Sequence, residues 1–460
     1  MTAVAWLFFA VALGCAMVYR FGRLREFEPR WAAALLVFGA GTLAGIGGAS
    51  CLFFVCRVAV PRVPKLSLFV EAAILVWLVY EIWRKRDRTA RTGVAARSPF
   101  TLPLALAMIV ALVVATSAMA DAWEANPQGG WDAWSIWNLR ARFLAEGTQP
   151  QRAWAPELTW THPEYPLLTS AFVARCWTYA GSIADAAPIV TSYLFFIALI
   201  AILAGGLAAW RGRSVGLLCG LVLLGSPSFL HEVIAQYADI PLACYLAGAT
   251  MFLLLDRPLI AGLFAGLAAW TKDEGILFLA VLLTGIAILR RKHIWQIAAG
   301  AIPGAALTAV FKVALAPRVS VVFGGGASAI VRRALDAGRI GQVLGAFAHE
   351  FGAMGLGWYH PILPLIALAI TLRFERDRRA DMLLAGVIPT AMLAGSFCIF
   401  LITPFDVKWQ LQTTLYRVIV QVWPSLLLCM FCGLCAPENA ALQMPEVSAK
   451  TRRKAGSRRA

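Results

Sequence analysis

Charged side chains are scarce in this sequence. Only 14% of its 460 residues are Asp, Glu, Lys or Arg, whereas 60% are hydrophobic and the mean hydropathy is +0.72. Because about a quarter of the residues in a soluble domain are charged, this composition excludes an ordinary soluble globular protein. The length allows roughly 13 membrane spans, since each span needs about 20 apolar residues.

Acidic residues are rarer than basic ones. The chain has 25 Asp and Glu against 41 Lys and Arg, which gives a net charge of +16. The basic residues lie in short loops and in the tail, where membrane topology requires them, and no basic domain rich in aromatic residues is present. We therefore expect no nucleic-acid partner.

Groupings that would indicate disulfides or metal ligands are also lacking. Most of the ten cysteines lie in apolar runs, where Cys behaves as a small hydrophobic residue. Cys429, Cys432 and Cys435 have a metal-like spacing, but they lie in an apolar run without His or carboxylate neighbours. No His, Asp or Glu cluster has convincing ligand spacing, so neither a metal ion nor another cofactor is expected.

What the chain has in abundance is long apolar runs. They predict helices at residues 3–19, 32–56, 66–83, 100–120, 187–210, 214–230, 240–255, 259–271, 275–289, 294–315, 360–372, 382–403 and 417–435. We expect an all-α, polytopic membrane bundle of about 13 transmembrane helices with a helical and irregular loop region on its outer face.

Three regions are expected along the chain. Residues 1–98 form N-terminal accessory transmembrane helices, residues 99–435 form the main transmembrane region with an outer loop at 121–186, and residues 436–460 form a disordered, basic cytoplasmic tail. With thirteen helices and an outside N-terminus, every basic cluster falls on the cytoplasmic side. The loop at 121–186 then lies on the opposite face.

That loop carries the first candidate site, Gly130-Trp131-Asp132-Ala133-Trp134-Ser135-Ile136-Trp137-Asn138. Tryptophans favour the interface of a membrane with water, so an interfacial helix explains them. Such a helix does not explain Asp132, because a carboxylate beside lipid phosphates is unfavourable without a purpose. Asp132 is therefore the preferred functional acid, and Asp121, at the outer end of the preceding helix, is the alternative.

The same loop continues with Thr161-His162-Pro163-Glu164-Tyr165-Pro166-Leu167. Its two prolines predict a rigid, non-helical segment. It is either a structural turn or a binding loop in which His162, Glu164 and Tyr165 bind a hydroxyl-rich substrate.

Three later segments place charge on the same face. Asp239 begins a helix and either stabilises its N-terminus or contributes to a site. The turn between two apolar helices contains Lys272, Asp273 and Glu274, which is more charge than a tight helical hairpin needs. Lys272 therefore either binds a phosphate or belongs to a solvated turn. Arg417 lies where a loop becomes a helix, and is either a snorkelling residue or a phosphate ligand.

Together these segments resemble the GT-C superfamily of bacterial integral-membrane glycosyltransferases. The resemblance covers roughly residues 100–430 and is carried by Trp131 to Trp137, His162 to Leu168, Tyr237-Ala238-Asp239-Ile240-Pro241-Leu242, Gly262-Leu263 through Trp270 to Gly275, and Thr414 to Arg417 with Pro424. The chain departs from the family in two respects: Ala133 follows Asp132 where many members have a second acid, and three helices precede the expected core.

The resemblance implies a sugar donor linked to polyprenyl phosphate, transfer with inversion, and a glycolipid, glycan or protein acceptor. It also implies a place in the bacterial inner (plasma) membrane, with the site on the periplasmic or extracellular face. Asp132, or Asp121 in its place, would be the catalytic acid. The implied substrate-binding residues are His162, Glu164, Tyr165, Asp239, Lys272, Glu274, Arg140 and Arg417.

Two other classes of protein remain open. A transporter or flippase of lipid-linked sugars would use the same ligands without breaking a bond, but such proteins generally need ionisable groups at mid-membrane depth. A non-catalytic scaffold would leave the polar clusters scattered in space. Convergence of Asp132, Asp239, Lys272 and Arg417 would count against the scaffold.

Overall fold

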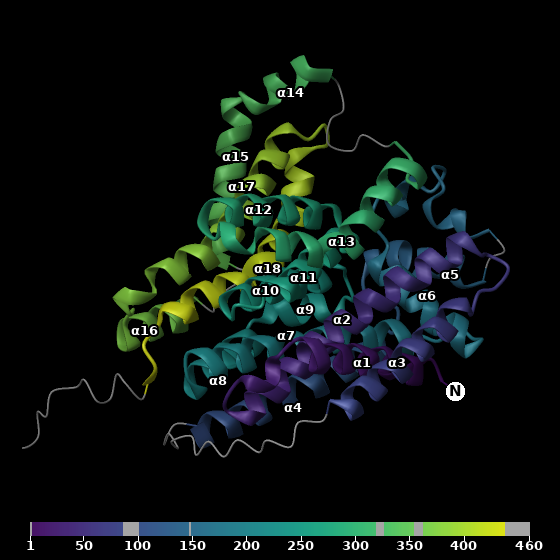
Figure 1. Cartoon of the computed structure of the whole chain (residues 1–460). Coiled ribbons are helices and arrows are strands. Elements are labelled where there is room, and N and C mark those ends of the chain that lie inside the picture. Colours follow the sequence, from purple (N-terminus) through teal and green to yellow (C-terminus); the bar gives the residue numbers. More distant parts are fainter. Residues whose placement is uncertain (1, 86–100, 147–148, 319–325, 354–361, 438–460) are drawn as a thin grey trace, which may run out of the picture.

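The computed structural model describes residues 2–85, 101–146, 149–318, 326–353 and 362–437, and its ordered elements are helical (Figure 1). The α-helices are α1 Ala3–Phe21, α2 Arg30–Ala59, α3 Leu66–Arg84, α4 Thr101–Ala125, α5 Leu139–Glu146, α6 Leu168–Ala180, α7 Ala186–Trp210, α8 Arg213–Leu224, α9 Pro227–Ile234, α10 Asp239–Leu254, α11 Pro258–Thr271, α12 Asp273–Leu289, α13 Ile294–Val310, α14 Gly326–Ala334, α15 Ala337–Ala353, α16 Ile362–Leu372, α17 Arg379–Ile402 and α18 Val407–Gly433. Short turns of other helix types include the π-helix η2 (Ala133–Asn138), η3 (Pro150–Trp154) and η4 (Thr159–Thr161). The described residues form no strand, so the predicted all-α class is confirmed.

Every predicted apolar run overlaps one of these helices. Within the described part of the chain, eight helices are long and apolar enough to cross a membrane, or up to nine if α8 and α9, which meet at 65°, form one span. Helices α10 and α11 are apolar but shorter. The chain is thus a multi-pass membrane protein by the length and composition of its helices, and the count of about thirteen crossings stays a prediction.

The centre of the bundle is formed by α2, α7, α10, α11 and α18. Every residue of α10 is buried, and α11 packs closely against α13 because small residues face each other. A Cβ atom on Gly266 would lie 2.2 Å from the carbonyl oxygen of Ala301, and one on Gly304 would lie 2.2 Å from that of Gly266. Small residues at such crossings let helix backbones approach without lipid or bulky side chains between them.

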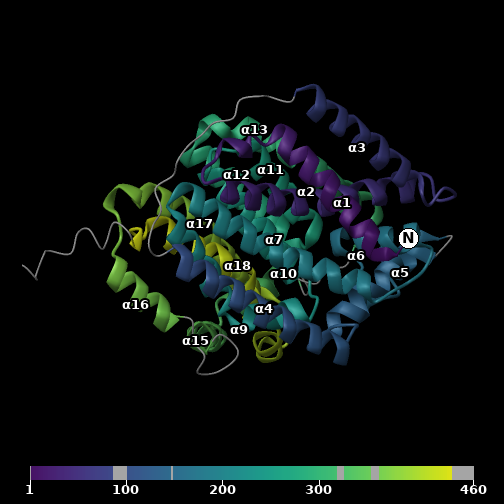
Figure 2. The same cartoon turned by 90° about the horizontal axis from the view of Figure 1, so that it is seen from below.

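The N-terminal helices are joined to this core to different degrees. Helix α2 packs against α1, α7 and α6, while α3 lies at the edge of the bundle (Figure 2). A buried pair attaches α3 to α6: Arg175 Nε donates to Glu71 Oε1 at 2.8 Å, and both side chains are 0% exposed. The division of residues 1–98 from 99–435 stays a prediction, and most of the expected tail lies outside the described residues.

Several basic clusters in the described part of the chain lie at neighbouring helix ends. Ion pairs join neighbouring helix ends there: Arg257 with Glu26 at 3.2 Å, Arg290 with Asp381 at 3.2 Å, and Arg211 with Glu375 at 2.6 Å. Segments α5 and α6 lie at the opposite end (Figure 1). These ion pairs bring described basic residues of several clusters together, and the membrane side of either end stays a prediction.

Candidate functional site

Asp239 is the centre of a buried ion network. Its side chain is 0% exposed, and Lys272 Nζ lies 3.0 Å from its Oδ1 oxygen. Arg417 Nη2 lies 2.6 Å from its Oδ2 oxygen, and the Gln421 amide donates to Oδ1. A buried carboxylate is stable only when it is paired and hydrogen-bonded, and these three donors supply the pairing.

Arg417 extends the network from Asp239 to the protein surface. Its Nη2 atom lies 2.7 Å from Asp132 Oδ2, and the Asp132 side chain is 20% exposed. The Tyr237 ring lies against the guanidinium, with 4.4 Å between Cζ and the ring centroid, which is a cation–π contact. The fully buried Glu232 lies 3.9 Å from Arg417 Nε. Asp132 is therefore a solvent-accessible carboxylate attached to a buried ionic centre.

Sequence spacing on three helices directs these side chains to one point. Arg417 and Gln421 are four residues apart on α18 and so share one face. Asp239 is the first residue of α10, where a carboxylate is favoured by the helix dipole. Lys272 is the extended residue between α11 and α12 (φ −151°, ψ 165°), and its Nζ also lies 3.2 Å from Glu274 Oε1.

Two glycines set the position of Asp132. Gly129 has φ +74°, a conformation that favours glycine. The Gly130 amide donates to the carbonyl oxygen of Ala235 at 3.0 Å, and a Cβ atom on Gly130 would lie 2.5 Å from the Tyr237 hydroxyl oxygen. The outer loop thus docks directly on the α9–α10 connection, and Asp132 follows two residues later.

The carboxylates of the network outnumber its cations. The acids are Asp132, Glu232, Asp239 and Glu274, and the cations are Lys272 and Arg417. Burial opposes the charge of Lys272, but Asp239 and Glu274 outweigh burial and raise the pKa of the ammonium. An anionic ligand would therefore gain attraction here mainly by displacing a carboxylate from a cation.

The loop around His162 lies beside this network. His162 Nδ1 lies 3.2 Å from Glu164 Oε1, and the His162 ring stacks on Tyr165, which stacks on Trp137. Burial would raise the pKa of Glu164, but the hydrogen bond with His162 and that with the backbone hold it below its usual value. Burial, and then the nearby Glu274 carboxylate, raises the pKa of Tyr165.

Arg140 is placed differently from the expectation that it binds substrate. It is fully buried, and it donates to the carbonyl oxygens of Ala153 and Tyr165 at 2.7 Å and of His162 and Pro163 at 3.3 Å. Its planar set of donors therefore holds the 150–165 loop in shape. These contacts give Arg140 a structural role in the loop, and its expected substrate-binding role stays a prediction.

Asp121 and Asp239, two other predicted site residues, differ in their place relative to the network, and the role of each stays a prediction. Asp121 is exposed on α4 and forms no ion pair with any residue in the described part of the chain, so it is not a member of the network. Asp239 belongs to the network, but its oxygens accept from Lys272, Arg417 and Gln421. It positions the two cations and is not exposed to a ligand.

The site residues predicted from the sequence do not include four members of this region, Glu232, Gln236, Tyr237 and Gln421. Glu232, Gln236 and Tyr237 precede Asp239 closely, and Gln236 adopts a positive φ of 58° and donates to the carbonyl oxygen of Pro127 at 3.0 Å. Nothing in the local sequence indicates that residues 235–237 contact the outer loop at residues 127–130. Gln421 could have been found, because it lies one helical turn after Arg417.

Among the described residues, no three His, Cys, Asp or Glu side chains converge as metal ligands would. No protein-family model matches the chain, and neither a curated protein nor a solved structure is significantly similar to it. The class that the fold itself defines is a multi-pass helical membrane protein with a buried ion network. Asp239 and Lys272 lie at one end of α10 and α11, and Arg257 connects the other ends of these two helices.

Proposed function

We propose that the protein is a membrane glycosyltransferase that moves a sugar from a polyprenyl-phosphate donor to an acceptor hydroxyl, with inversion. The observation that carries this proposal is the convergence of Asp132, Lys272 and Arg417, which are 285 residues apart at the extremes, around Asp239. Base-assisted transfer from a phosphate-linked sugar requires an accessible carboxylate and cations near the leaving phosphate. Asp132 pairs with Arg417, and Asp239 joins Arg417 to Lys272.

In this reaction Asp132 is the general base. The acceptor oxygen bonds to the anomeric carbon, the carbon–oxygen bond to the phosphate breaks, and the electron pair leaves with the phosphate. The acceptor proton passes to the Asp132 carboxylate. Its 20% exposure is consistent with a group that an acceptor must reach.

Arg417 and Lys272 stabilise the leaving phosphate. The Nη1 nitrogen of Arg417 donates to no residue in the described part of the chain, so one edge of the guanidinium is open to a phosphate oxygen. A phosphate that takes Nη2 from Asp132 would release the Asp132 carboxylate for proton transfer. Donor binding and activation of the base are then one event.

The proposal includes a side of the membrane. The basic clusters at the far end of the bundle belong in the cytoplasm by the positive-inside rule, which puts Asp132 on the extracytoplasmic face of a bacterial inner membrane. The acceptor there is a glycolipid, a glycan or a protein, and the polyprenyl chain lies in the bilayer beside the apolar helices.

The test uses the full chain in proteoliposomes with a panel of undecaprenyl-phosphate-linked hexoses, pentoses and uronic acids. Bacterial envelope glycolipids serve as acceptors, and mass spectrometry measures the transferred sugar. We expect Asp132→Asn to lower the transfer rate at least about 100-fold, because a general base contributes roughly 10²–10⁴-fold. Donor binding should remain.

Asp121→Asn is the matched control, since Asp121 is also an acid of the outer region but is exposed and outside the network. It should transfer at the wild-type rate. Near-normal transfer by Asp132→Asn, or loss of transfer by Asp121→Asn, would contradict the assignment of the base.

A transporter or flippase of lipid-linked sugars is the second candidate, and Glu232 is the observation that favours it. This carboxylate is fully buried, and neither oxygen has a hydrogen bond of ordinary geometry in the described residues. The Tyr416 hydroxyl and the Arg417 guanidinium are its nearest polar neighbours. Buried ionisable groups of this kind mark proton or ion pathways in membrane proteins. Movement of an intact lipid-linked sugar between leaflets, without release of polyprenyl phosphate, would select this candidate.

A further inference from the structure

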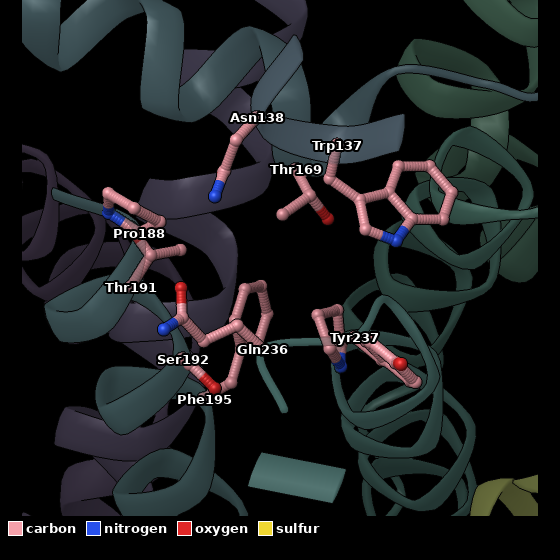
Figure 3. Close-up of a pocket in the computed structure, with 10 residues that line it drawn as sticks. Trp137, Asn138, Thr169, Pro188, Thr191, Ser192, Phe195, Gln236 and Tyr237 are labelled. Atoms are coloured by element: carbon pink, nitrogen blue, oxygen red, sulfur yellow. The ribbon is translucent and has the colours of Figure 1, made fainter. Parts of the chain in front are cut away.

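A second polar feature lies next to the ion network, in a pocket between η2, α6, α7 and the start of α10 (Figure 3). Trp137, Asn138 and Thr169 reach into it from one side, and Gln236 lies across from them. Its empty volume is about 290 Å³, including the part open to solvent. None of these residues takes part in the ion network.

The pocket gathers polar atoms that have no partner. The indole nitrogen of Trp137, the amide nitrogen of Asn138, the hydroxyl of Thr169 and the amide oxygen of Gln236 are all buried without a hydrogen bond in the described part of the chain. Trp137, Asn138 and Gln236 are 2%, 4% and 6% exposed. Buried polar groups are nearly always satisfied, so this concentration indicates that a ligand or water completes them.

Charge and donor type limit what that ligand is. No charged side chain lines the pocket, so it suits a neutral group. The two nitrogens only donate, the Gln236 oxygen only accepts, and the Thr169 hydroxyl does both. A hydroxyl group, which also donates and accepts, matches this set. Most of the 290 Å³ is space around the opening, and the enclosed part admits a group little larger than a water molecule. A ring hydroxyl or a hydroxymethyl arm fits this space, but a whole sugar ring does not.

The pocket adjoins the proposed reaction centre. Tyr237 lines it and also lies against the guanidinium of Arg417. Pro241, another lining residue, is two positions after Asp239 on α10. Trp137 is five residues after Asp132 in the same segment. A group held in the pocket would therefore belong to a molecule that reaches the network.

We infer that this pocket binds one hydroxyl-bearing arm of the transferred sugar and so determines which sugar the protein accepts. The inference rests on the proposed function. In it, Trp137 and Asn138 donate to the sugar oxygen, the sugar hydroxyl donates to Gln236, and Thr169 completes the set. A sugar without that hydroxyl leaves these atoms unpaired, which is the strongest way in which a polar pocket rejects an analogue.

The experiment measures binding to the full chain in lipid nanodiscs. The probes are geranyl phosphate alone, geranyl phosphate carrying glucose, mannose, galactose or arabinose, and the single-deoxy derivatives of the sugar that binds most tightly. The quantity of interest is the gain in affinity that the sugar adds to geranyl phosphate. We expect Thr169→Val and Gln236→Leu each to reduce this gain about tenfold, because an unpaired buried polar group costs roughly that much.

One deoxy sugar should show the same loss with the wild-type protein, and Thr169→Val should add no further loss for that sugar. Affinity for bare geranyl phosphate should be unchanged in Thr169→Val, which also shows that this variant folds. Gln236→Leu also loses its hydrogen bond to the Pro127 carbonyl oxygen, so its sugar gain is measured against its own affinity for geranyl phosphate. Thr191→Val is the matched control, since Thr191 lines the same pocket but its hydroxyl already donates to the Ala187 carbonyl at 2.7 Å. It should change the gain less than twofold.

Each other outcome overturns the inference. If both variants keep the full sugar gain, the pocket holds only water. If the variants lower the affinity for bare geranyl phosphate as much as the affinity for the sugar-carrying form, the pocket supports the network and does not contact the sugar. If the wild-type protein binds no geranyl phosphate at all, the proposed function fails, and this inference fails with it.

Discussion

In the described part of the chain, two ion clusters contain charged side chains that are 0% exposed, and they differ in what surrounds them. In the cluster between α3 and α6, Arg175 is paired with Glu71, and both side chains are 0% exposed. Tyr179 donates to Glu71 at 3.1 Å and lies 2.6 Å from the Ser67 hydroxyl, while Arg175 also donates to the carbonyl oxygen of Trp6 at 2.9 Å. Its charges have no path to solvent.

The cluster around Asp239 is open at two points. Asp132 and Glu274 are 20% and 21% exposed, and they form ion pairs with Arg417 and Lys272 respectively. The same buried core of acid and base therefore ends in groups that a ligand can reach. Burial of an ion pair therefore does not by itself indicate a functional site, since the charges of a fully buried pair bind only to each other and to neighbouring protein groups. Exposed members and unused donors are what distinguish the Asp239 cluster.

The largest expected effect is on the closed cluster. Arg175→Met should destabilise the protein by about 3–5 kcal/mol, because it leaves the Glu71 carboxylate buried and unpaired. Thermal unfolding in nanodiscs measures the loss. Adding Glu71→Leu should restore most of the stability, since a hydrophobic pair is often as stable as a buried ion pair. If Arg175→Met alone is as stable as the wild-type protein, the Glu71–Arg175 cluster contributes nothing to the free energy of unfolding.

A smaller effect is expected where a buried charge meets only backbone. Arg140→Met should cost on the order of 2 kcal/mol, because hydrogen bonds from a charged donor are lost and carbonyl oxygens stay buried. The loss should appear as faster hydrogen exchange in residues 150–165. Arg142→Met, on the exposed side of the same helix, is the control and should leave exchange unchanged. Equal exchange in the two variants would contradict the structural role of Arg140.

The smallest change tests how the open cluster is held in position. Gly130→Ala places a methyl group 2.5 Å from the Tyr237 hydroxyl oxygen, so the Asp132 segment must shift. Because a displacement of about 1 Å costs up to about 100-fold in rate, we expect transfer to fall about 10- to 100-fold with little loss of stability. Gly48→Ala, where a Cβ meets no atom within 4 Å, should transfer normally. Wild-type transfer by Gly130→Ala would mean that this docking does not position the base.

The sequence predicts the helices well and the site in part. Apolar runs locate α7, α10, α11 and α18 because burial in lipid or in the core requires continuous hydrophobic stretches. The convergence of Asp132, Asp239, Lys272 and Arg417 agrees with their predicted common face, since alternating helices return each segment to the same end of the bundle.

What the sequence does not predict is which partner each charge finds. Arg140 and Arg417 are both arginines beside the outer region, yet one meets carbonyl oxygens and the other carboxylates. That difference depends on the left-handed backbone at His162 and on the contact of Gly129 and Gly130 with the α9–α10 connection. The pocket of Trp137 and Gln236 depends on the same tertiary contacts, and no local motif indicates it.

We propose that the open cluster performs the chemistry and that the closed cluster holds the fold. The most direct test of this proposal compares two double replacements in the same transfer assay, Glu71→Leu with Arg175→Met, and Asp239→Leu with Arg417→Met. The first removes the Glu71–Arg175 pair. The second removes the Asp239–Arg417 pair together with the contacts of Asp239 with Lys272 and of Arg417 with Asp132 and Glu232. We predict that the first protein transfers sugar at close to the wild-type rate and that the second, though folded, transfers none. Equal rates in the two proteins, or lost transfer in a folded first protein, would contradict the account.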